Sequence, residues 1–269
     1  MESKISEYSW MEILKEKYNL DAKKIEKNQQ STDHNVYEIY CDTKKYIAKI
    51  YHNINHTKSM TNLHHKLAKS KINVPKIIPS IIKENYVETP EKSYLVIYSF
   101  LEGKPISRSK ETGKFDRNTI SLIANELRKI HKFTSNYNQF DLPEISFAEN
   151  GNRKSLVHFD LTKNNIFIDA NHSIGIIDFD DAKYGESVCD IAILIANLFF
   201  SKTYGVDLEG INKLIDEYYL ENIELKNKEI PFIKEYALKW IEYTLRESIL
   251  DSSIVESFKI KYRFIEESL

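Results

Sequence analysis

The sequence predicts an α+β protein of two lobes, a strand-rich lobe over residues 1–98 and a mainly helical lobe over residues 105–269, joined by a link at 99–104. Short apolar runs with strand-like alternation dominate the first hundred residues. Apolar residues at helical spacing dominate from about residue 188 to the end. The tripeptide Gly103-Lys104-Pro105 separates the two patterns, because glycine and proline interrupt regular structure.

The strand-rich lobe is expected to contain two helices, a β-hairpin and one strongly apolar strand. Apolar residues at helical spacing predict helices over residues 8–18 and 57–70. The runs VYEIYC and KYIAKIY flank the turn Asp42-Thr43-Lys44 and predict the hairpin. Pro75 and Pro79 impose extended chain on the residues before them, and YLVIYSF, at 94–100, is typical of a buried strand.

The helical lobe is expected to begin with an amphipathic helix over residues 116–133. Two segments rich in polar residues follow it, VHFDLTKNNIFI at 157–168 and IIDFDDAKYG at 176–185. The longest apolar run, Ile191 to Phe200, is about ten residues long and contains Asn197. Because a membrane span needs about twenty apolar residues, this run predicts a buried helix.

The composition argues against several classes of protein. A formal net charge of -2 does not favour nucleic-acid binding through a strongly basic surface. The two cysteines, Cys41 and Cys189, are too few for a disulfide framework and fit a reducing compartment. The first ten residues, MESKISEYSW, lack the apolar core of a signal peptide. We therefore expect a cytoplasmic protein without nucleic-acid or membrane partners, with a monomer and a homodimer both open.

Polar residues at the ends of two apolar runs predict a metal site. Asn165 precedes the run 166–168, and Asp178 follows the run 174–177. If the runs pair as an antiparallel hairpin, the carboxamide oxygen of Asn165 and the carboxylate of Asp178 meet at its open end. Two hard oxygen ligands with room for water and phosphate suit Mg²⁺. Asp160, five residues before Asn165, then provides a carboxylate that is free of the metal and able to accept a proton.

This layout is the one that phosphoryl transfer requires, because a metal ion neutralises phosphate charge while a catalytic Asp orients the attacking hydroxyl group. The order His-x-Asp-x4-Asn, here from His158 to Asn165, is followed by the strand-terminal Asp178. That order is typical of the catalytic and metal-binding loops of kinases. The sequence therefore predicts a nucleoside triphosphate as phosphoryl donor, with ATP and GTP both open.

The first lobe holds three features that fit nucleotide binding. Lys49 lies in YIAKIY, a strand otherwise built of apolar and aromatic residues, where an ammonium group is expected to meet the α- and β-phosphates. A polar turn at residues 31–35 precedes this strand, at the place where a loop that covers the phosphates would lie. The link at residues 99–104 offers backbone groups to an adenine edge. The chain contains neither GxGxxG nor GxxxxGK[ST], which disfavours Walker-type and dinucleotide-fold binding. The candidate nucleotide contacts are Ser31, Thr32, Asp33, His34, Asn35, Lys49, Ser99, Phe100 and Leu101.

Over most of its length, the sequence resembles the aminoglycoside phosphotransferase and choline kinase-like family of small-molecule kinases. The densest likeness runs from VHFDLTKNNIFI through GIIDFDDAKYG to CDIA at 189–192, and STDHNVYEI, YIAKIY, VPKII, YLVIYSFLEG and LRKIHKF look like the family's other landmarks. The resemblance implies a bilobal protein kinase-like fold and structural roles for His158 and Asp190. It further implies a catalytic Asp160, metal ligands Asn165 and Asp178, a phosphate-binding Lys49 and an adenine hinge at 99–101.

Two positions depart from the family pattern. The family usually has Gly between the His and the Asp of the catalytic loop, where this chain has Phe159. The family also pairs its strand Lys with a Glu on the helix of the first lobe. The predicted helix 57–70 contains no acidic residue, so another Glu or His64 is expected to position Lys49.

A small molecule is the expected acceptor, because only about a dozen residues separate Asp178 from Asp190 and leave little platform for a peptide. A surplus of acidic residues after residue 178 favours a cationic acceptor such as an aminoglycoside or an amino alcohol. An aminoglycoside acceptor would give the protein a role in antibiotic resistance. Aromatic residues would supply walls and cation–π contacts. The acidic candidates are Asp180, Asp181, Glu186, Asp216, Glu217 and Glu221, and the aromatic ones are Tyr218, Tyr219, Trp240 and Tyr243.

Three alternatives stay open at this point. The acidic residues could form a solvated helix surface and the aromatic residues a core, without any acceptor contact. A Ser/Thr protein kinase of the same superfamily would transfer phosphate to a protein. A non-catalytic nucleotide-binding protein would account for the missing helix Glu, although it has no need of Asp160, Asn165 and Asp178 together.

Overall fold

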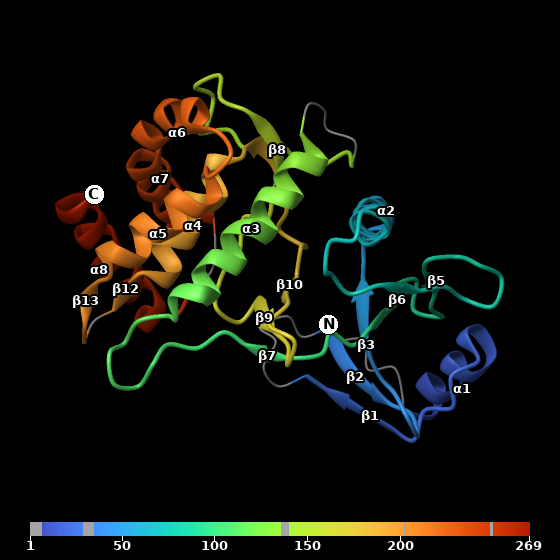
Figure 1. Ribbon diagram of the computed structural model, residues 1–269. Helices are drawn as coiled ribbons and strands as arrows, with labels where there is room; N and C mark the ends of the chain where they lie inside the picture. The colour runs from blue at the N-terminus through green and yellow to red at the C-terminus, as the bar shows by residue number, and fades with distance from the viewer. Residues whose placement is uncertain (1–6, 29–34, 136–139, 202, 248–249) are drawn as a thin grey trace. The chain divides into compact units, whose positions relative to one another are not determined.

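The computed structural model describes the chain except for residues 1–6, 29–34, 136–139, 202 and 248–249 (Figure 1). The chain divides into two compact units, Met1–Glu102 and Gly103–Leu269. The boundary falls inside the segment 99–104, where the sequence predicts a link. Strands are prominent in the first unit and helices in the second, so the predicted α+β class is confirmed.

The first unit is built on an antiparallel sheet. The strands follow the order β1-β2-β3-β6-β4, and β5 also pairs with β6. The predicted hairpin is confirmed as β2 and β3, in which Tyr40 faces Lys45. The strand bounds are β1 Lys24–Lys27, β2 Val36–Tyr40, β3 Lys45–Tyr51, β4 Ile77–Ile78, β5 Val87–Glu88 and β6 Tyr94–Ser99.

Helix α1 (Glu7–Tyr18) covers one face of this sheet. Its residues Trp10, Leu14 and Tyr18 are buried in one cluster with Ala48 and Ile50 of β3 and with Leu95 and Ile97 of β6. Because neighbouring residues of a strand point to opposite faces, Lys49 points to the face away from α1.

Helix α2 (Ile54–Lys69) packs on the opposite face of the sheet. The ring of His64 lies 4.8 Å from that of Tyr98, a β6 residue on the same face as Lys49. The helix begins before the predicted Thr57, because the side chain of Asn53 caps it and accepts hydrogen bonds from the backbone N–H groups of Asn55 and His56.

The second unit combines α-helices with short paired strands (Figure 1). Helix α3 packs against α5, α4 against α7, and α7 against α8. Strands β10, β9 and β7 form one small sheet, and β11–β8 and β12–β13 form two strand pairs. The bounds are β7 Lys104–Pro105, α3 Arg117–Thr134, β8 Lys154–Val157, β9 Ile166–Ile168, β10 Ile174–Ile176, β11 Lys183–Glu186, α4 Val188–Leu198, β12 Phe200–Ser201, β13 Gly205–Val206, α5 Leu208–Tyr218, α6 Ile223–Glu229, α7 Ile233–Glu247 and α8 Ser252–Ser268, with a 3₁₀ turn at Ile230–Phe232.

Two helix predictions in this unit are confirmed. Helix α3 lies one residue from the predicted bounds, and Asp116 caps it by accepting a hydrogen bond from Thr119 N–H at 2.9 Å. Helix α4 is the predicted buried helix, in which every residue except Asn197 is buried. None of the helices in the described parts of the chain is long and apolar enough to cross a membrane.

We predict that Leu14→Ala lowers the free energy of unfolding of the protein by about 2–5 kcal/mol, because it removes a fully buried side chain and leaves a cavity against the sheet. Urea denaturation followed by circular dichroism measures this. The control Glu12→Ala changes an exposed residue of the same helix and should shift the value by less than about 0.5 kcal/mol. Equal effects of the two substitutions would contradict the packing of α1 on the sheet.

Candidate active site

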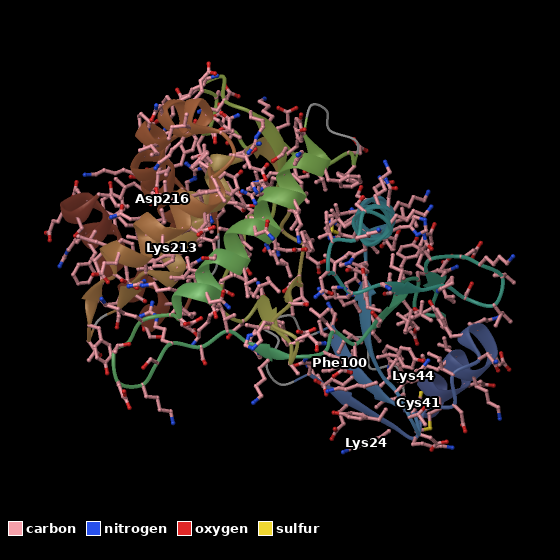
Figure 2. All side chains as sticks on the ribbon, in the orientation of Figure 1. Lys24, Cys41, Lys44, Phe100, Lys213 and Asp216 are labelled. Carbon is pink, nitrogen blue, oxygen red and sulfur yellow. The ribbon has the colours of Figure 1, made fainter. Side chains whose placement is uncertain are left out.

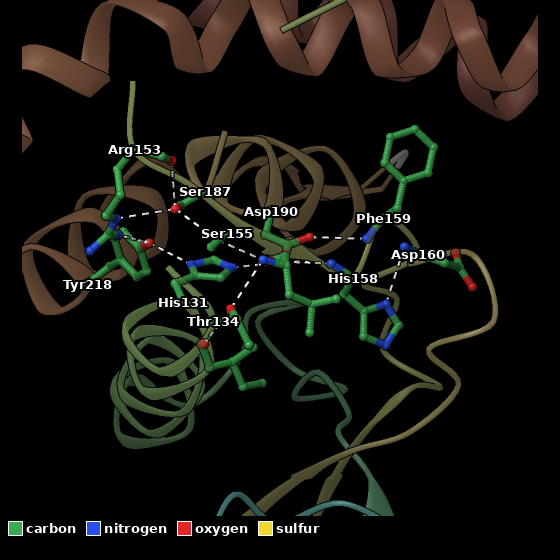
Figure 3. Close-up of polar contacts among 12 residues, drawn as sticks. His131, Thr134, Arg153, Ser155, His158, Phe159, Asp160, Ser187, Asp190 and Tyr218 are labelled. Atoms are coloured by element: carbon green, nitrogen blue, oxygen red, sulfur yellow. Dashed lines mark hydrogen bonds and ion pairs between the residues drawn. The ribbon is translucent and has the colours of Figure 1, made fainter. Parts of the chain in front are cut away.

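The buried carboxylate of Asp190 organises the candidate catalytic loop (Figure 3). Its Oδ2 accepts hydrogen bonds from His158 N–H at 2.9 Å and from His131 Nε2 at 3.0 Å, while its Oδ1 accepts one from Phe159 N–H at 3.2 Å. Asp190 lies in the first turn of α4 and His131 in the last turn of α3. One carboxylate therefore joins two helices to the backbone of the loop.

The imidazole of His131 is fully buried and bonded at both nitrogens. Since Nε2 donates to Asp190, Nδ1 accepts from the hydroxyl group of Tyr218 at 2.6 Å. Arg153 in turn donates to the oxygen of Tyr218 at 2.7 Å. Burial lowers the pKa of His131 below its ordinary value, despite the neighbouring carboxylate of Asp190. A neutral imidazole fits both hydrogen bonds.

His158 holds the loop on its other side. Its Nε2 donates to the carbonyl oxygen of Ile177 at 2.8 Å, and its Nδ1 accepts from Asp160 N–H at 3.3 Å. Its ring also contacts Phe179, with 4.6 Å between the ring centroids. These contacts use both ring nitrogens for the shape of the loop, which supports the structural role expected for His158.

Phe159 occupies the position where the resembling family usually has glycine. Its φ of 70° lies in the left-handed region, which typically costs a non-glycine residue about 1 kcal/mol. Its carbonyl oxygen accepts a hydrogen bond from Trp240 Nε1 at 3.1 Å. Its ring packs edge-on against Tyr243 at 5.3 Å, and the ammonium group of Lys183 lies 4.6 Å from the ring centre. Packing of the side chain thus offsets the strained backbone.

Asp160 and Asn165 are hydrogen-bonded directly. The amide nitrogen of Asn165 donates to Oδ2 of Asp160 at 2.8 Å and to its carbonyl oxygen at 2.9 Å, which leaves the amide oxygen as the atom able to meet a cation. Burial raises the pKa of Asp160 to about 6. His158 opposes this rise, whereas the negative charges of Asp178 and Asp181 add to it.

The predicted hairpin is confirmed as β9 and β10, which pair antiparallel with Ile166 opposite Ile176. The N–H of Ile177 donates to the carbonyl oxygen of Asn165 at 3.0 Å, so Asn165 and Asp178 stand at the same end of the hairpin. The charge of Asp178 reaches Asp160 as well. The structure thus brings Asp160, Asn165 and Asp178 together within the second unit.

The donor set at this end of the hairpin fits a hard cation. No cluster of three or more His, Cys, Asp or Glu side chains within the described ranges could hold a metal by itself. Asn165 and Asp178 would therefore supply two oxygen ligands, with water and phosphate oxygens completing the shell. Mg²⁺ is commonly held in this way, since it keeps several waters and binds through few protein groups.

In the first unit, Lys49 lies on β3 between Val36 of β2 and Val96 of β6. Helix α2, on the same face of the sheet, has no acidic residue, as the sequence shows. His64 makes a hydrogen bond of 3.0 Å between its Nδ1 and the carbonyl oxygen of Pro75. A role for His64 in positioning Lys49 stays a prediction.

The other candidate nucleotide contacts are described only in part. Residues 31–34 lie outside the described ranges, and the carbonyl oxygen of Asn35 accepts from Ile50 N–H at 3.0 Å. Ser99 N–H donates to the carbonyl oxygen of Lys76 at 2.7 Å. Phe100, labelled in Figure 2, lies under the ammonium group of Lys45, at 4.4 Å from the ring centre. Contact of residues 99–101 with an adenine edge stays a prediction.

Of the acidic acceptor candidates, Glu186 has no access to solvent. Its carboxylate accepts hydrogen bonds of 2.6 Å from Asn152 Nδ2 and 2.6 Å from the hydroxyl group of Tyr236. Glu186 therefore holds the interior together, and we leave it out of the acceptor site. Asp180 is half-buried and Asp181 exposed, so both keep access to solvent.

The acidic residues of α5 and the turn after it are paired with bases. Asp216 binds Lys226 at 2.6 Å, Glu217 binds Lys213 at 2.6 Å, and Glu221 lies 3.7 Å from Arg128. Figure 2 labels Lys213 and Asp216 on α5. The aromatic candidates Tyr218, Tyr219 and Trp240 are buried, whereas Tyr243 is half-buried beside Phe159. These positions favour the alternative of a paired surface and an aromatic core.

The model of the phosphotransferase enzyme family, APH, matches residues 142–213. The resemblance expected from the sequence is confirmed over this segment, which contains Asp160, Asn165, Asp178 and Asp190. No curated protein matches the chain.

Three solved structures show the likeness of the whole chain. The amicoumacin kinase hAmiN, in complex with AMP-PNP and Ca²⁺, is 14% identical over 98% of this chain and 94% of its own, with a TM-score of 0.72. The chain has the fold of the small-molecule kinases. A microcompartment-associated aminopropanol kinase is 13% identical over 97% and 94%, with a TM-score of 0.69. The choline kinase LicA from Streptococcus pneumoniae is 13% identical over 97% and 98%, with a TM-score of 0.61.

Some residues of this kinase fold were not singled out from the sequence. His131 stands in LRKIHKF, a segment that resembles a family landmark, but its bond to Asp190 has no local sequence signal. Lys183 follows the candidate metal ligand Asp178, and its only sequence signal is a basic residue among acidic ones. Lys261 lies on a C-terminal helix without any motif.

We predict that Asp190→Asn lowers the free energy of unfolding by about 3–5 kcal/mol, because the amide places N–H donors against the N–H groups of the loop in a buried site. Urea denaturation measures the loss. The control Asp169→Asn, which keeps the oxygen that caps the hairpin turn, should change stability much less. Wild-type stability of Asp190→Asn would show that this carboxylate does not hold the loop.

Proposed function

We propose that the protein is a kinase that transfers the γ-phosphoryl group of a nucleoside triphosphate to a hydroxyl group of a small molecule. The observation that carries the proposal is the arrangement of Asp160, Asn165 and Asp178 at one end of a hairpin, on a loop held by the buried Asp190. The match of the phosphotransferase family model over the same residues supports it.

Asp160 is the proposed catalytic residue. Its carboxylate orients the acceptor hydroxyl group and takes its proton as the hydroxyl oxygen bonds to the γ-phosphorus atom. The bond between that phosphorus and the β,γ-bridging oxygen breaks, and the nucleoside diphosphate leaves. The hydrogen bond from Asn165 to Oδ2 fixes the orientation of the carboxylate, so that Oδ1 faces the acceptor.

Asn165 and Asp178 are the proposed ligands of Mg²⁺, which neutralises the charge of the phosphates when it is bound. In the first unit, Lys49 would bind the phosphates, residues 31–35 would cover them, and residues 99–101 would meet the adenine or guanine edge. ATP and GTP both fit these roles as the donor. A cytoplasmic location accompanies the proposal, since nucleoside triphosphates are the donors.

A small-molecule acceptor is favoured over a peptide by the chain after Asp178. Residues 183–186 of this segment form β11, which pairs with β8, and α4 begins at Val188. The segment is thus taken up by regular structure and leaves little room for a peptide platform. The similar structures point in the same direction, since they include an amicoumacin kinase, an aminopropanol kinase and a choline kinase.

We predict that Asp160→Asn lowers kcat by about 10²–10⁴-fold, because the amide keeps the contact with Asn165 but accepts no proton. Nucleoside diphosphate release would be measured with a panel of hydroxyl acceptors, and nucleotide binding by a fluorescent analogue. Binding should stay close to that of the wild type. The control Glu149→Gln removes an exposed carboxylate of the same unit and should be fully active. A fully active Asp160→Asn variant would rule out the proposed role.

We predict that Asp178→Ala abolishes the dependence of nucleotide binding on Mg²⁺, because it removes the one carboxylate among the two proposed ligands. Titration of a fluorescent nucleotide with and without Mg²⁺ measures this, alongside the control Asp181→Ala, an exposed carboxylate three residues further on. Unchanged Mg²⁺ dependence in Asp178→Ala would place the metal elsewhere.

A further inference from the structure

Two basic side chains from distant parts of the sequence converge at the end of α4. Arg108, which follows β7, donates to the carbonyl oxygens of Leu198 at 2.8 Å and of Phe200 at 2.7 Å. Lys261 of α8 donates to Oδ1 of Asn197 at 2.8 Å. Burial lowers the pKa of Lys261 and the charge of Arg108 lowers it further, so the two groups are electrostatic neighbours.

This pair adjoins the candidate catalytic loop. Asn197, the half-buried residue of α4, uses its Nδ2 to donate to the carbonyl oxygen of Leu161 at 3.1 Å. Leu161 directly follows Asp160, and the charge of Asp160 acts on Lys261. Asn197 therefore connects Lys261 to the loop that carries the proposed catalytic carboxylate, all within the second unit.

Neither base has a carboxylate partner within 4 Å in the part of the chain that the structure describes. Asp207 is the acid that acts on Arg108, but both its oxygens are bound by Arg117 at 2.9 Å. Lys261 lies over Phe258 and Arg108 over Phe115, at 4.9 Å and 5.4 Å from the ring centres. These rings carry no net charge, so Asp160 and Asp207 oppose the two positive charges only from beyond ion-pair distance.

Both basic side chains are also partly buried. Burial lowers the pKa of Lys261 to about 8, with a further contribution from Arg108, and burial likewise lowers the pKa of Arg108. Neighbouring, desolvated like charges are costly unless an anion compensates them. Arg108 binds two backbone carbonyl oxygens, so capping of the C-terminus of α4 accounts for its position. Capping does not account for the position of Lys261, which binds a side-chain amide.

We propose that Lys261, supported by Arg108, forms an anion subsite for the acceptor, so that the acceptor is a hydroxyl compound carrying a carboxylate or another anionic group. The anionic group lies at Lys261 while the hydroxyl group meets Asp160. This inference rests on the proposed function and names its substrate class. It differs from the cationic acceptor expected from the sequence; Asp216 and Glu217 are already paired with bases, whereas Asp180 and Asp181 keep access to solvent.

Matched pairs of acceptors test the charge directly. Glycerate would be compared with glycerol, and homoserine with 2-amino-1,4-butanediol, by nucleoside diphosphate release. The wild-type protein is expected to prefer the acidic member of a pair in kcat/KM. Lys261→Met should abolish this preference through a rise of about 10–100-fold in KM for the acidic acceptor, as expected for a lost charged hydrogen bond. Its kcat should change little.

Lys259→Met is the matched control, because Lys259 lies on the same helix and is exposed. It should keep the preference of the wild type. The free energy of unfolding of Lys261→Met should not fall, since the substitution removes a desolvated charge beside Arg108, whereas a purely structural lysine would be needed for stability. A loss of kcat that is equal for acidic and neutral acceptors, with KM unchanged, would assign Lys261 to the transferred phosphoryl group and overturn the acceptor subsite.

A second measurement does not depend on turnover. Inorganic sulfate, titrated without nucleotide, should raise the Tm of the wild type and of Lys259→Met more than that of Lys261→Met. If no acceptor is phosphorylated but this difference holds, the anion site stands and the proposed kinase function fails. If turnover occurs without any preference for acidic acceptors and sulfate stabilises all three proteins equally, the kinase function stands and the anion subsite is refuted.

Discussion

The second unit depends on the buried carboxylate of Asp190. It accepts three N–H hydrogen bonds, two from the backbone at His158 and Phe159 and one from the ring of His131. Hydrogen bonds to a charged group typically contribute about 1.5–3 kcal/mol each, so the loop is held firmly relative to α3 and α4. A rigid loop gives Asp160 a fixed orientation, and orientation is most of what a protein contributes to phosphoryl transfer.

At Phe159, an unfavourable backbone conformation is stabilised by contacts with residues that are distant in the sequence. Its left-handed φ turns the chain after its own N–H, so that its carbonyl oxygen meets Trp240 and the N–H of Asp160 meets Nδ1 of His158. Glycine would adopt this conformation freely, whereas phenylalanine requires compensation. Its carbonyl oxygen binds Trp240, and its ring contacts Tyr243 and Lys183. The departure from the family pattern is therefore built into the packing of α7 and β11 against the loop.

The distribution of charge gives the helical unit two different kinds of surface. Acids on and after α5 are neutralised by nearby bases such as Lys213 and Lys226. At the end of α4, by contrast, Lys261 and Arg108 have no carboxylate partner within 4 Å among the described residues, although the charge of Asp160 acts on Lys261. The acids counted along the sequence therefore fall into two groups, those of α5 that are paired with bases and Asp180 and Asp181, which keep access to solvent. Whether a charged side chain has an oppositely charged neighbour in the folded protein decides whether its charge can act on a ligand.

The sequence by itself determined the features that depend on residues close together in the chain. Strand alternation, the amphipathic helix that begins after Asp116, and the hairpin that joins Asn165 to Asp178 are local, and so is the spacing of His158, Asp160 and Asn165. Only the tertiary structure decided what depends on distant contacts. Glu186 is removed from solvent by Tyr236, and Lys261 is connected to the loop by Asn197, because burial and ion pairing arise when separate helices pack together.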